Sequence, residues 1–483
     1  MKNVRSIVKV LGTLFSTLGI IMLGCTLFSI VIEDNAHQGF AAAGISTLVI
    51  GLVMFFSCYS YPNRITKKEG YLIVGLSWLG MAVISALPYI LCLELNVTDA
   101  FFESTSGLTT TGATIFNDVE VLPRSILLWR SLTQWIGGMG IIVLTVAILP
   151  LLGVGGVELF TAEAPGPTSD KIHPRIRETA KRLWMIYLGF TLLLTLLLWL
   201  EGMTLFDAVN HGLTTMATGG FSTKNASIAH FSSPMIEYTI GAFMLLAGIN
   251  YTVHFFFLTG RWKKVFSNEE WRTYMIFVGL FVLIIAGILI LNDPKWTGEN
   301  ALRSSFFQVT SIITTTGFVI DDYTGWGTGI TFIFFLLLFM GGCAGSTSGG
   351  IKMIRHLVFI KNSYLEFKRL LHPKAVIRLK INQEVVPARV LTHILVFLLL
   401  YMIVFFGGCI LLSFGGLDFE TALGAMATSL SNVGPAIGKV GPVNTFAFLD
   451  QTTKAFLAFI MLIGRLEIYS ILILLTPFYW RDF

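Results

Sequence analysis

Long apolar runs without a charged residue are the feature that most restricts how this chain can fold. Two of them, Leu188 to Leu200 and Ile276 to Leu291, lie in stretches near the roughly 20 apolar residues that a helix needs to cross a bilayer. The 483 residues are 54% hydrophobic and only 13% charged, whereas soluble domains carry about 25% charged residues. Membrane β-barrels instead alternate over strands of about 10 residues. The sequence therefore excludes a soluble domain and predicts an all-α polytopic membrane protein.

About ten membrane spans are expected, and the charges between them indicate their orientation. With the N-terminus taken as cytoplasmic, 24 of the 33 Lys and Arg residues fall in segments assigned to the inside, as the positive-inside rule requires. Both termini are then cytoplasmic, and the first span is expected to remain uncleaved. The basic segment 352–389 is either a topology anchor or a docking surface for a cytosolic partner. The inner segment 152–182 is a second candidate for this docking surface. The spans are expected near residues 6–32, 41–61, 71–95, 126–150, 183–200, 236–259, 273–292, 329–350, 391–413 and 454–478.

Signatures of enzymes, metal sites and nucleic-acid binding do not occur in the sequence. The five cysteines are scattered through apolar stretches without a CxxC pair or zinc-like spacing, so we expect neither disulfides nor a metal centre. The sequence carries no HExxH, GxSxG, phosphate-loop or dinucleotide fingerprint. We therefore expect no enzyme activity, no cofactor bound by this chain and no nucleic-acid partner.

A semi-apolar stretch too short to cross the membrane recurs four times, each time followed by a turn rich in Thr, Ser and Gly. The copies align on one glycine each: Gly112, Gly220, Gly317 and Gly434. Their intervals of 108, 97 and 117 residues indicate a duplicated unit of span, half-helix, loop and span. In the second copy Gly219 is an alternative, and we choose Gly220 because Asp207 then lies thirteen residues upstream, as Asp99 lies before Gly112.

The repeats predict five parts of the chain. An N-terminal two-helix extension precedes four pore units, in the third of which a glycine-rich stretch interrupts the second span. The expected boundaries are 1–68 for the extension and 69–172, 173–267, 268–387 and 388–483 for the units.

Four such units around one axis predict an ion pore. Non-helical backbone at membrane depth must be buried in protein or line a wet cavity. A half-helix that enters from outside points the negative end of its dipole toward the membrane centre, which favours a cation, and rings of carbonyls can replace the hydration shell of potassium. The alternative, that the four stretches are ordinary outer loops, does not explain why the four copies share one register. The expected filter residues are Thr110, Thr111, Gly112, Thr218, Gly219, Gly220, Thr315, Thr316, Gly317, Asn432, Val433 and Gly434.

With these filters, the chain resembles the Trk/Ktr/HKT superfamily of cation transporters, and within it the TrkH/TrkG-like membrane subunit of bacterial potassium uptake systems. The resemblance implies a pseudo-tetrameric, potassium-channel-like pore in the bacterial inner membrane. It further implies potassium as the substrate, a homodimer and regulation by a cytosolic TrkA-type nucleotide-binding subunit. Relatives that admit sodium tend to have Ser at the first filter position, where this chain has Gly112. Further segments that carry the resemblance are Gln134 to Gly140, Ala147 to Pro150, Ala164 to Pro167, Gly341 to Gly350 and Gly464 to Glu467.

A gate is expected below the third filter. The ten residues Gly341 to Gly350 include five glycines, each of which disfavours a helix by about 1 kcal/mol relative to Ala, although a small-residue packing face would look alike. The resemblance assigns the gating role to Gly345, Ser346, Thr347 and Gly349.

Ionisable residues in the last span add to this gate. Arg465 and Glu467 lie at membrane depth, where charges are usually functional. We expect Arg465 to reach under the filter and hold the loop, with Glu467 or Lys352 supporting the closed arrangement. A structural ion pair that locks two helices is the alternative.

Two other transport modes stay open at this point. A proton-coupled potassium symporter would need a titratable group on the ion path, and Glu103 and His211 are the nearest candidates. A sodium-permeable relative of the same fold is the second. Secondary transporters built from inverted repeats fit less well, because the four units share one orientation.

Overall fold

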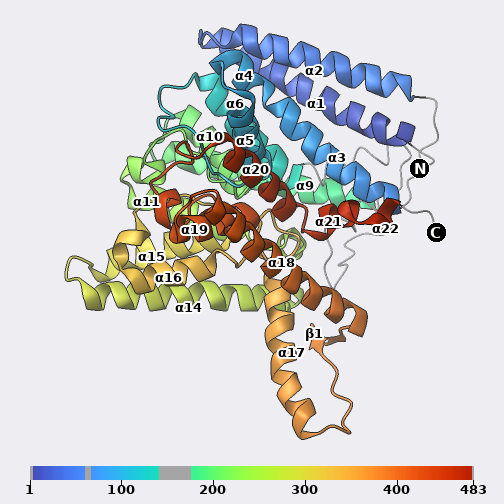
Figure 1. The fold of residues 1–483 in the computed structure, drawn as a ribbon. Coiled ribbons are helices and arrows are strands. Elements are labelled where there is room, and N and C mark those ends of the chain that lie inside the picture. The colour runs from blue at the N-terminus through green and yellow to red at the C-terminus, as the bar shows by residue number, and fades with distance from the viewer. Residues whose placement is uncertain (1–3, 60–66, 141–175, 481–483) are drawn as a thin grey trace.

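Nearly every element of the structure, a computed structural model, is a helix (Figure 1). It describes residues 4–59, 67–140 and 176–480. The first pair, α1 (Val4–Val31) and α2 (His37–Ser57), is antiparallel and closely packed, because glycines line its interface. A β-carbon added at Gly12 would lie 2.6 Å from the amide nitrogen of Phe55, the close helix approach that small residues allow in membranes.

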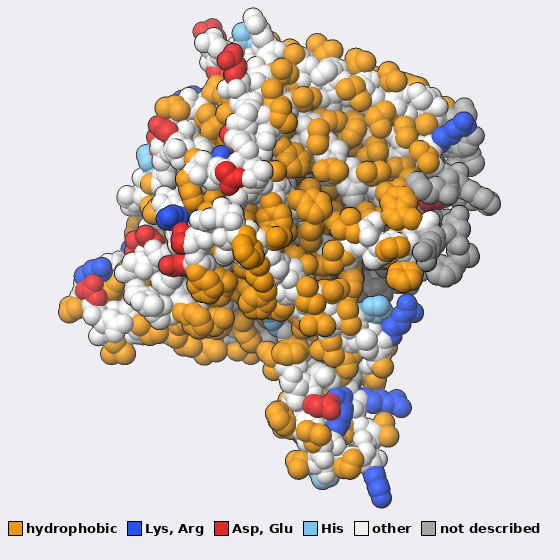
Figure 2. All heavy atoms as spheres, viewed as in Figure 1, with side chains coloured by type: hydrophobic (Ala, Val, Ile, Leu, Met, Phe, Trp, Pro, Cys, Tyr) orange, Lys and Arg blue, Asp and Glu red, His pale blue; other side chains and the backbone are white. Residues whose placement is uncertain are grey.

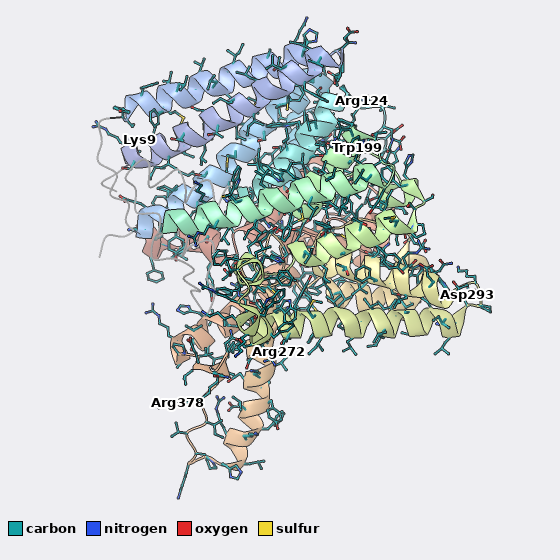
Figure 3. All side chains as sticks on the ribbon, turned by 180° about the vertical axis from the view of Figure 1, so that it is seen from behind. Lys9, Arg124, Trp199, Arg272, Asp293 and Arg378 are labelled. Atoms are coloured by element: carbon teal, nitrogen blue, oxygen red, sulfur yellow. The ribbon has the colours of Figure 1, made fainter. Side chains whose placement is uncertain are left out.

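Within the described residues, six helical segments are long and apolar enough to span a membrane. Figure 3 shows Arg124, Trp199 and Asp293 at one end of the helices and Lys9 at the other. The six segments are α1, α2, Lys68–Leu93 in α3 (Lys67–Ser85) and α4 (Leu87–Leu93), Ala180–Leu200 in α9 (Ile176–Leu200), α14 (Glu269–Asn292) and α18 (Ala388–Phe414).

Four half-helices occur where the repeats predict them. Each begins at a polar residue whose side chain accepts a hydrogen bond from a backbone amide three residues on, and each carries an acid in its first turn, as helix starts favour. These caps are Asn96, Thr204, Thr297 and Asp418. The half-helices are α5 (Val97–Leu108), α10 (Leu205–Met216), α15 (Gly298–Ile313) and α19 (Phe419–Ser431).

The second helix of the second, third and fourth units is interrupted, and this corrects three of the expected spans. Residues 236–259 are two helices at 103° to one another, and residues 454–478 contain a bend of 115°. Residues 329–350 form one short helix and then a loop, whereas the end of span 126–150 lies outside the described residues. These helices are α6 (Arg124–Trp135) with the π-helical segment Ile136–Gly140, α11 (Pro234–Ala247) with α12 (Tyr251–Leu258), α16 (Thr328–Leu337), and α20 (Gln451–Arg465) with α21 (Tyr469–Leu475).

A basic arm projects from the third unit, away from the body of the helices (Figure 1). It consists of α17 (Met353–Leu371) and the antiparallel hairpin of β1 (Lys380–Ile381) and β2 (Glu384–Val385). In Figure 2 hydrophobic side chains cover most of the body, whereas Lys and Arg gather on this arm. Short elements complete the fold: the 3-10 turns Ser227–Phe231, Tyr323–Trp326 and Gly438–Val440, and helices α13 (Trp262–Phe266) and α22 (Pro477–Trp480).

Candidate ion pathway

The loop after each half-helix has the same unusual backbone. In every unit one non-glycine residue has φ between 52° and 58°, and the glycine two positions later has φ between 78° and 98°. Left-handed residues that alternate with right-handed ones turn successive peptide groups toward the same side. The first set is Thr110, Thr218, Thr315 and Asn432, and the second is Gly112, Gly220, Gly317 and Gly434. The second copy is thus in register at Gly220.

The four loops close into a ring around one axis. A β-carbon built on Gly112 would lie 2.3 Å from the carbonyl oxygen of Gly219, and one on Gly220 would lie 2.0 Å from that of Thr316. The same contact runs from Gly317 to Val433 at 2.0 Å. It then returns from Gly434 to Thr111 at 2.7 Å. Each glycine therefore faces the carbonyl that precedes the glycine of the next unit, with no room for a side chain.

Each loop is fastened to its own half-helix. The amide that precedes the aligned glycine donates to a carbonyl five residues back, over 2.9 to 3.1 Å. These donor and acceptor residues are Thr111 to Ser106, Gly219 to Thr214, Thr316 to Ser311 and Val433 to Thr428. Because the loop and the helix end form one hydrogen-bonded unit, the C-terminal dipole of the half-helix is directed at the loop.

The fourth loop differs from the first and third at its outer side. Ser106 and Ser311 donate to the carbonyl one residue beyond the aligned glycine, at Ala113 and Phe318. Thr428 instead donates to Gly434 itself, over 2.8 Å. The loop Val433-Gly434-Pro435 therefore departs from the first and third loops in its hydrogen bonds, although the backbone angles are preserved.

Glu103 and His211, the candidates for proton coupling, have well-defined partners behind the loops. Glu103 is fully buried, forms an ion pair with Arg130 over 2.9 Å and accepts from the amide of Ile115. His211 is also fully buried, between the carbonyl of Asp207 and the hydroxyl of Ser222. Glu103 thus supports the backbone after the first loop at Ile115, and His211 joins its half-helix to the side chain of Ser222.

The glycine-rich loop between α16 and α17 lies directly against the ring. Its Gly349 amide donates to the hydroxyl of Thr315 over 2.6 Å. Thr347 donates from its hydroxyl to the carbonyl of Met216, at the end of the second half-helix, over 3.1 Å. Gly345 has φ 75° and its carbonyl accepts from the amide of Tyr251. A β-carbon built on Gly349 would lie 2.4 Å from the carbonyl oxygen of Ser431, so the loop contacts the second, third and fourth units.

Arg465 joins the loop to the first unit. Its guanidinium donates to the carbonyl of Thr347 over 2.9 Å and to those of Gly137 and Gly138 over 2.7 and 2.8 Å. Among the residues singled out from the sequence, Lys352 donates to the carbonyl of Ser348. The contact that we expected between Arg465 and the loop is present.

Glu467 pairs with a residue that the sequence analysis did not single out. It forms an ion pair with Arg355 of α17, and the two side chains are 14% and 5% exposed. Arg355 also lies over the ring of Phe397, 3.8 Å from its centroid. This pair joins the bend of the fourth unit to the start of the basic arm.

Sequence reasoning missed Gln134, Arg130 and Arg355. Gln134 donates to the carbonyl of Gly219 over 2.6 Å and accepts from the amide of Phe221 over 3.1 Å. For Gln134 and Arg130 the available signal was a polar side chain within an apolar span, since such residues are expensive in a membrane. Arg355 instead lies in the basic segment 352–389. The partners of Gln134 and Arg355 lie in other units, whereas Arg130 pairs with Glu103 of its own unit.

Fold and site together define a polytopic helical membrane protein in which four re-entrant half-helices surround one axis. The family model described as "Cation transport protein", TrkH, matches residues 36–481. The chain belongs to this family, which is one of transporters and not of enzymes.

Individual relatives align over nearly the whole chain. The Trk system potassium uptake protein TrkH of Salmonella typhimurium is 40% identical over 99% of both chains. TrkG of Escherichia coli is 34% identical over 99% of both. The crystal structure of the potassium transporter TrkH from Vibrio parahaemolyticus matches with a TM-score of 0.89 and 37% identity, covering 99% of this chain and 100% of that one.

Proposed function

We propose that this protein takes up potassium ions across the bacterial inner membrane through the ring of four loops. The ring is the observation that carries the proposal, because each aligned glycine faces a carbonyl of the next unit. Such rings replace the hydration shell of potassium. The relatives named as potassium uptake proteins and the four-glycine filter favour potassium over sodium. Thr110, Thr218 and Thr315, with Asn432, form its inner edge.

The gate of this pathway is the loop that contains Gly345, Ser346, Thr347 and Gly349. Arg465 supports the closed arrangement, because its charge stands below the filter and its hydrogen bonds join the loop to Gly137. Glu467 and Lys352 hold the adjoining segments through Arg355 and Ser348. Opening would require the loop to exchange these hydrogen bonds for others.

Regulation is assigned to a TrkA-type nucleotide-binding subunit that docks on the inner basic face of a homodimer. Within the arm, Lys368 and Arg369 are the residues to change. Charge reversal at both should abolish binding of the subunit, whereas unaltered binding would contradict this surface. Residues 152–175 of the other expected surface lie outside the described residues.

Purified protein in liposomes tests the proposal. Flux of potassium, rubidium and sodium is measured with and without the cytosolic subunit, while the ion gradients and the proton gradient are varied independently. We expect flux selective for potassium and rubidium that follows the electrochemical gradient. Flux that stops when the proton gradient is removed would instead favour a symporter, and equal sodium flux would favour a sodium-permeable relative.

Arg465→Ala tests the gate in the same assay. Loss of the guanidinium removes three hydrogen bonds and one positive charge below the filter, so flux without the subunit should increase. Unchanged flux together with unchanged dependence on the subunit would exclude a gating role for Arg465.

A further inference from the structure

The residue before the aligned glycine carries a side chain in three filter loops but not in the second. Thr111 and Thr316 hold their loops through hydroxyl pairs with Thr109 and Thr314, each over 2.8 Å. Val433 is the apolar counterpart in the fourth loop. The second loop has Gly219 there, and Gly219 does not have a positive φ. Backbone conformation therefore does not explain this glycine.

The side chain of Gln134, from α6 of the first unit, occupies the vacant place. A β-carbon built on Gly219 would lie 2.3, 2.4 and 2.8 Å from its three nearest atoms, and all three belong to the Gln134 amide. Gln134 is fully buried. Its amide donates to the Gly219 carbonyl and accepts from the Phe221 amide, so that it holds the backbone on both sides of Gly220.

We propose that Gln134 is a positioning residue for ion selectivity, which supplies from the first unit the restraint that the second filter loop lacks. This inference rests on the proposed function, since it concerns the same ring. Without the Gln134 amide, the Gly219 carbonyl and the Phe221 amide lose their buried partner. The peptide groups beside Gly220 can then rotate, because glycine adopts left-handed and right-handed backbone conformations about equally well. The ring would lose its fixed spacing at the corner between Gly112 and Gly219, and sodium would be rejected less well.

Two variants test this role against a merely structural one. Gln134→Leu keeps the volume but removes both hydrogen bonds, and the potassium-to-sodium flux ratio in liposomes should fall about tenfold, the factor that corresponds to about 1.4 kcal/mol. The triple variant Gln134→Ala/Ala217→Thr/Gly219→Thr moves the restraint back into the second loop. Ala217→Thr is included because Thr111 and Thr316 pair with a threonine two positions back, where the second loop has Ala217. The triple variant should recover most of the ratio and unfold at a higher temperature than Gln134→Ala.

Gln308→Leu is the matched control. Gln308 is a buried glutamine of the third half-helix, whose amide donates to the Asp321 carbonyl outside the ring. It should lower thermal stability and leave the flux ratio unchanged.

Each result decides the proposal. A folded Gln134→Leu variant with the wild-type ratio would overturn it, and so would a folded triple variant that does not recover the ratio. If Gln134→Leu does not fold, the triple variant decides alone. Wild-type protein without potassium selectivity would count against the proposed function, and the unfolding temperatures would then still show whether Thr at position 219 replaces Gln134.

Discussion

The four filter loops are nearly alike, whereas the four segments directly below them all differ. In the loops, φ at equivalent residues varies by only a few degrees at the first position and by 20° at the glycine. Below, the first unit has a π-helical segment, the second a bend of 103°, the third a glycine-rich loop and the fourth a bend of 115°. A ring of carbonyls needs the same geometry from each unit. The glycine-rich loop of one unit needs space from the other three, so symmetry is kept in the ring and lost beneath it.

The lower region also contains strained backbone. Glu467 and Ile468 have φ of 55° and 56°, which is uncommon for any side chain and an outlier for a β-branched one. Such strain persists only where surrounding contacts hold the backbone in the strained conformation. Here the ion pair of Glu467 with Arg355 and the hydrogen bonds of Arg465 provide those surroundings.

The largest effect is expected from breaking the symmetry of the ring itself. Alanine at an aligned glycine adds a β-carbon in a left-handed conformation, which costs about 1–2 kcal/mol, and forces it against a carbonyl. Gly220→Ala and Gly317→Ala, with contacts of 2.0 Å, should abolish selective flux. Gly434→Ala, where the contact is 2.7 Å, should retain the most.

Rubidium flux in liposomes measures this order. Gly189→Ala is the control, because a β-carbon there meets no atom within 4 Å. An equal loss of rubidium flux in all four alanine variants would show that backbone strain sets the effect, rather than the distance from each glycine to the carbonyl of the next unit.

The ring could be predicted from the sequence, whereas most of the region below it could not. The half-helices and the register of the glycines were predicted, because a local pattern of cap, short apolar stretch and Thr-Gly turn produces each of them. The choice of Gly220 over Gly219 agrees with the backbone angles.

The breaks of the second and fourth units were not predicted, because apolar residues continue through them and hydropathy does not report the direction of a helix. The contacts that hold the units together were missed for another reason. Gln134 and Gly219 are 85 residues apart, and Arg355 and Glu467 are 112 apart. A polar side chain in an apolar stretch indicates that it has a partner, but the sequence does not identify which residue that partner is.

A smaller effect is expected from the ion pair of the lower region. Glu467→Gln leaves Arg355 buried without its counter-charge, and breaking a buried pair in this way destabilises a protein by about 3–5 kcal/mol. Thermal unfolding in detergent should show a large decrease, with increased flux in the absence of the cytosolic subunit. The double variant Arg355→Met/Glu467→Met should be far less destabilised, because no charge is left unpaired. If the double variant is as unstable as Glu467→Gln, the pair is not the main support of the bend.

The smallest effect, and the most direct test of how the two regions communicate, concerns the bond from the Gly349 amide to the Thr315 hydroxyl. Thr315→Val removes the acceptor without changing the shape of the side chain, and a typical hydrogen bond contributes about 0.5–1.5 kcal/mol. Flux without the cytosolic subunit should therefore rise a few-fold, because the loop leaves the ring more easily. Thr315→Ser keeps the hydroxyl and should behave as the wild type.

Thr218→Val is the matched control, since the Thr218 hydroxyl donates to its neighbour Ala217 and contacts no part of the loop by hydrogen bond. If Thr218→Val and Thr315→Val raise the flux equally, the filter would act as one symmetric element, and the asymmetry below it would not be transmitted through Thr315.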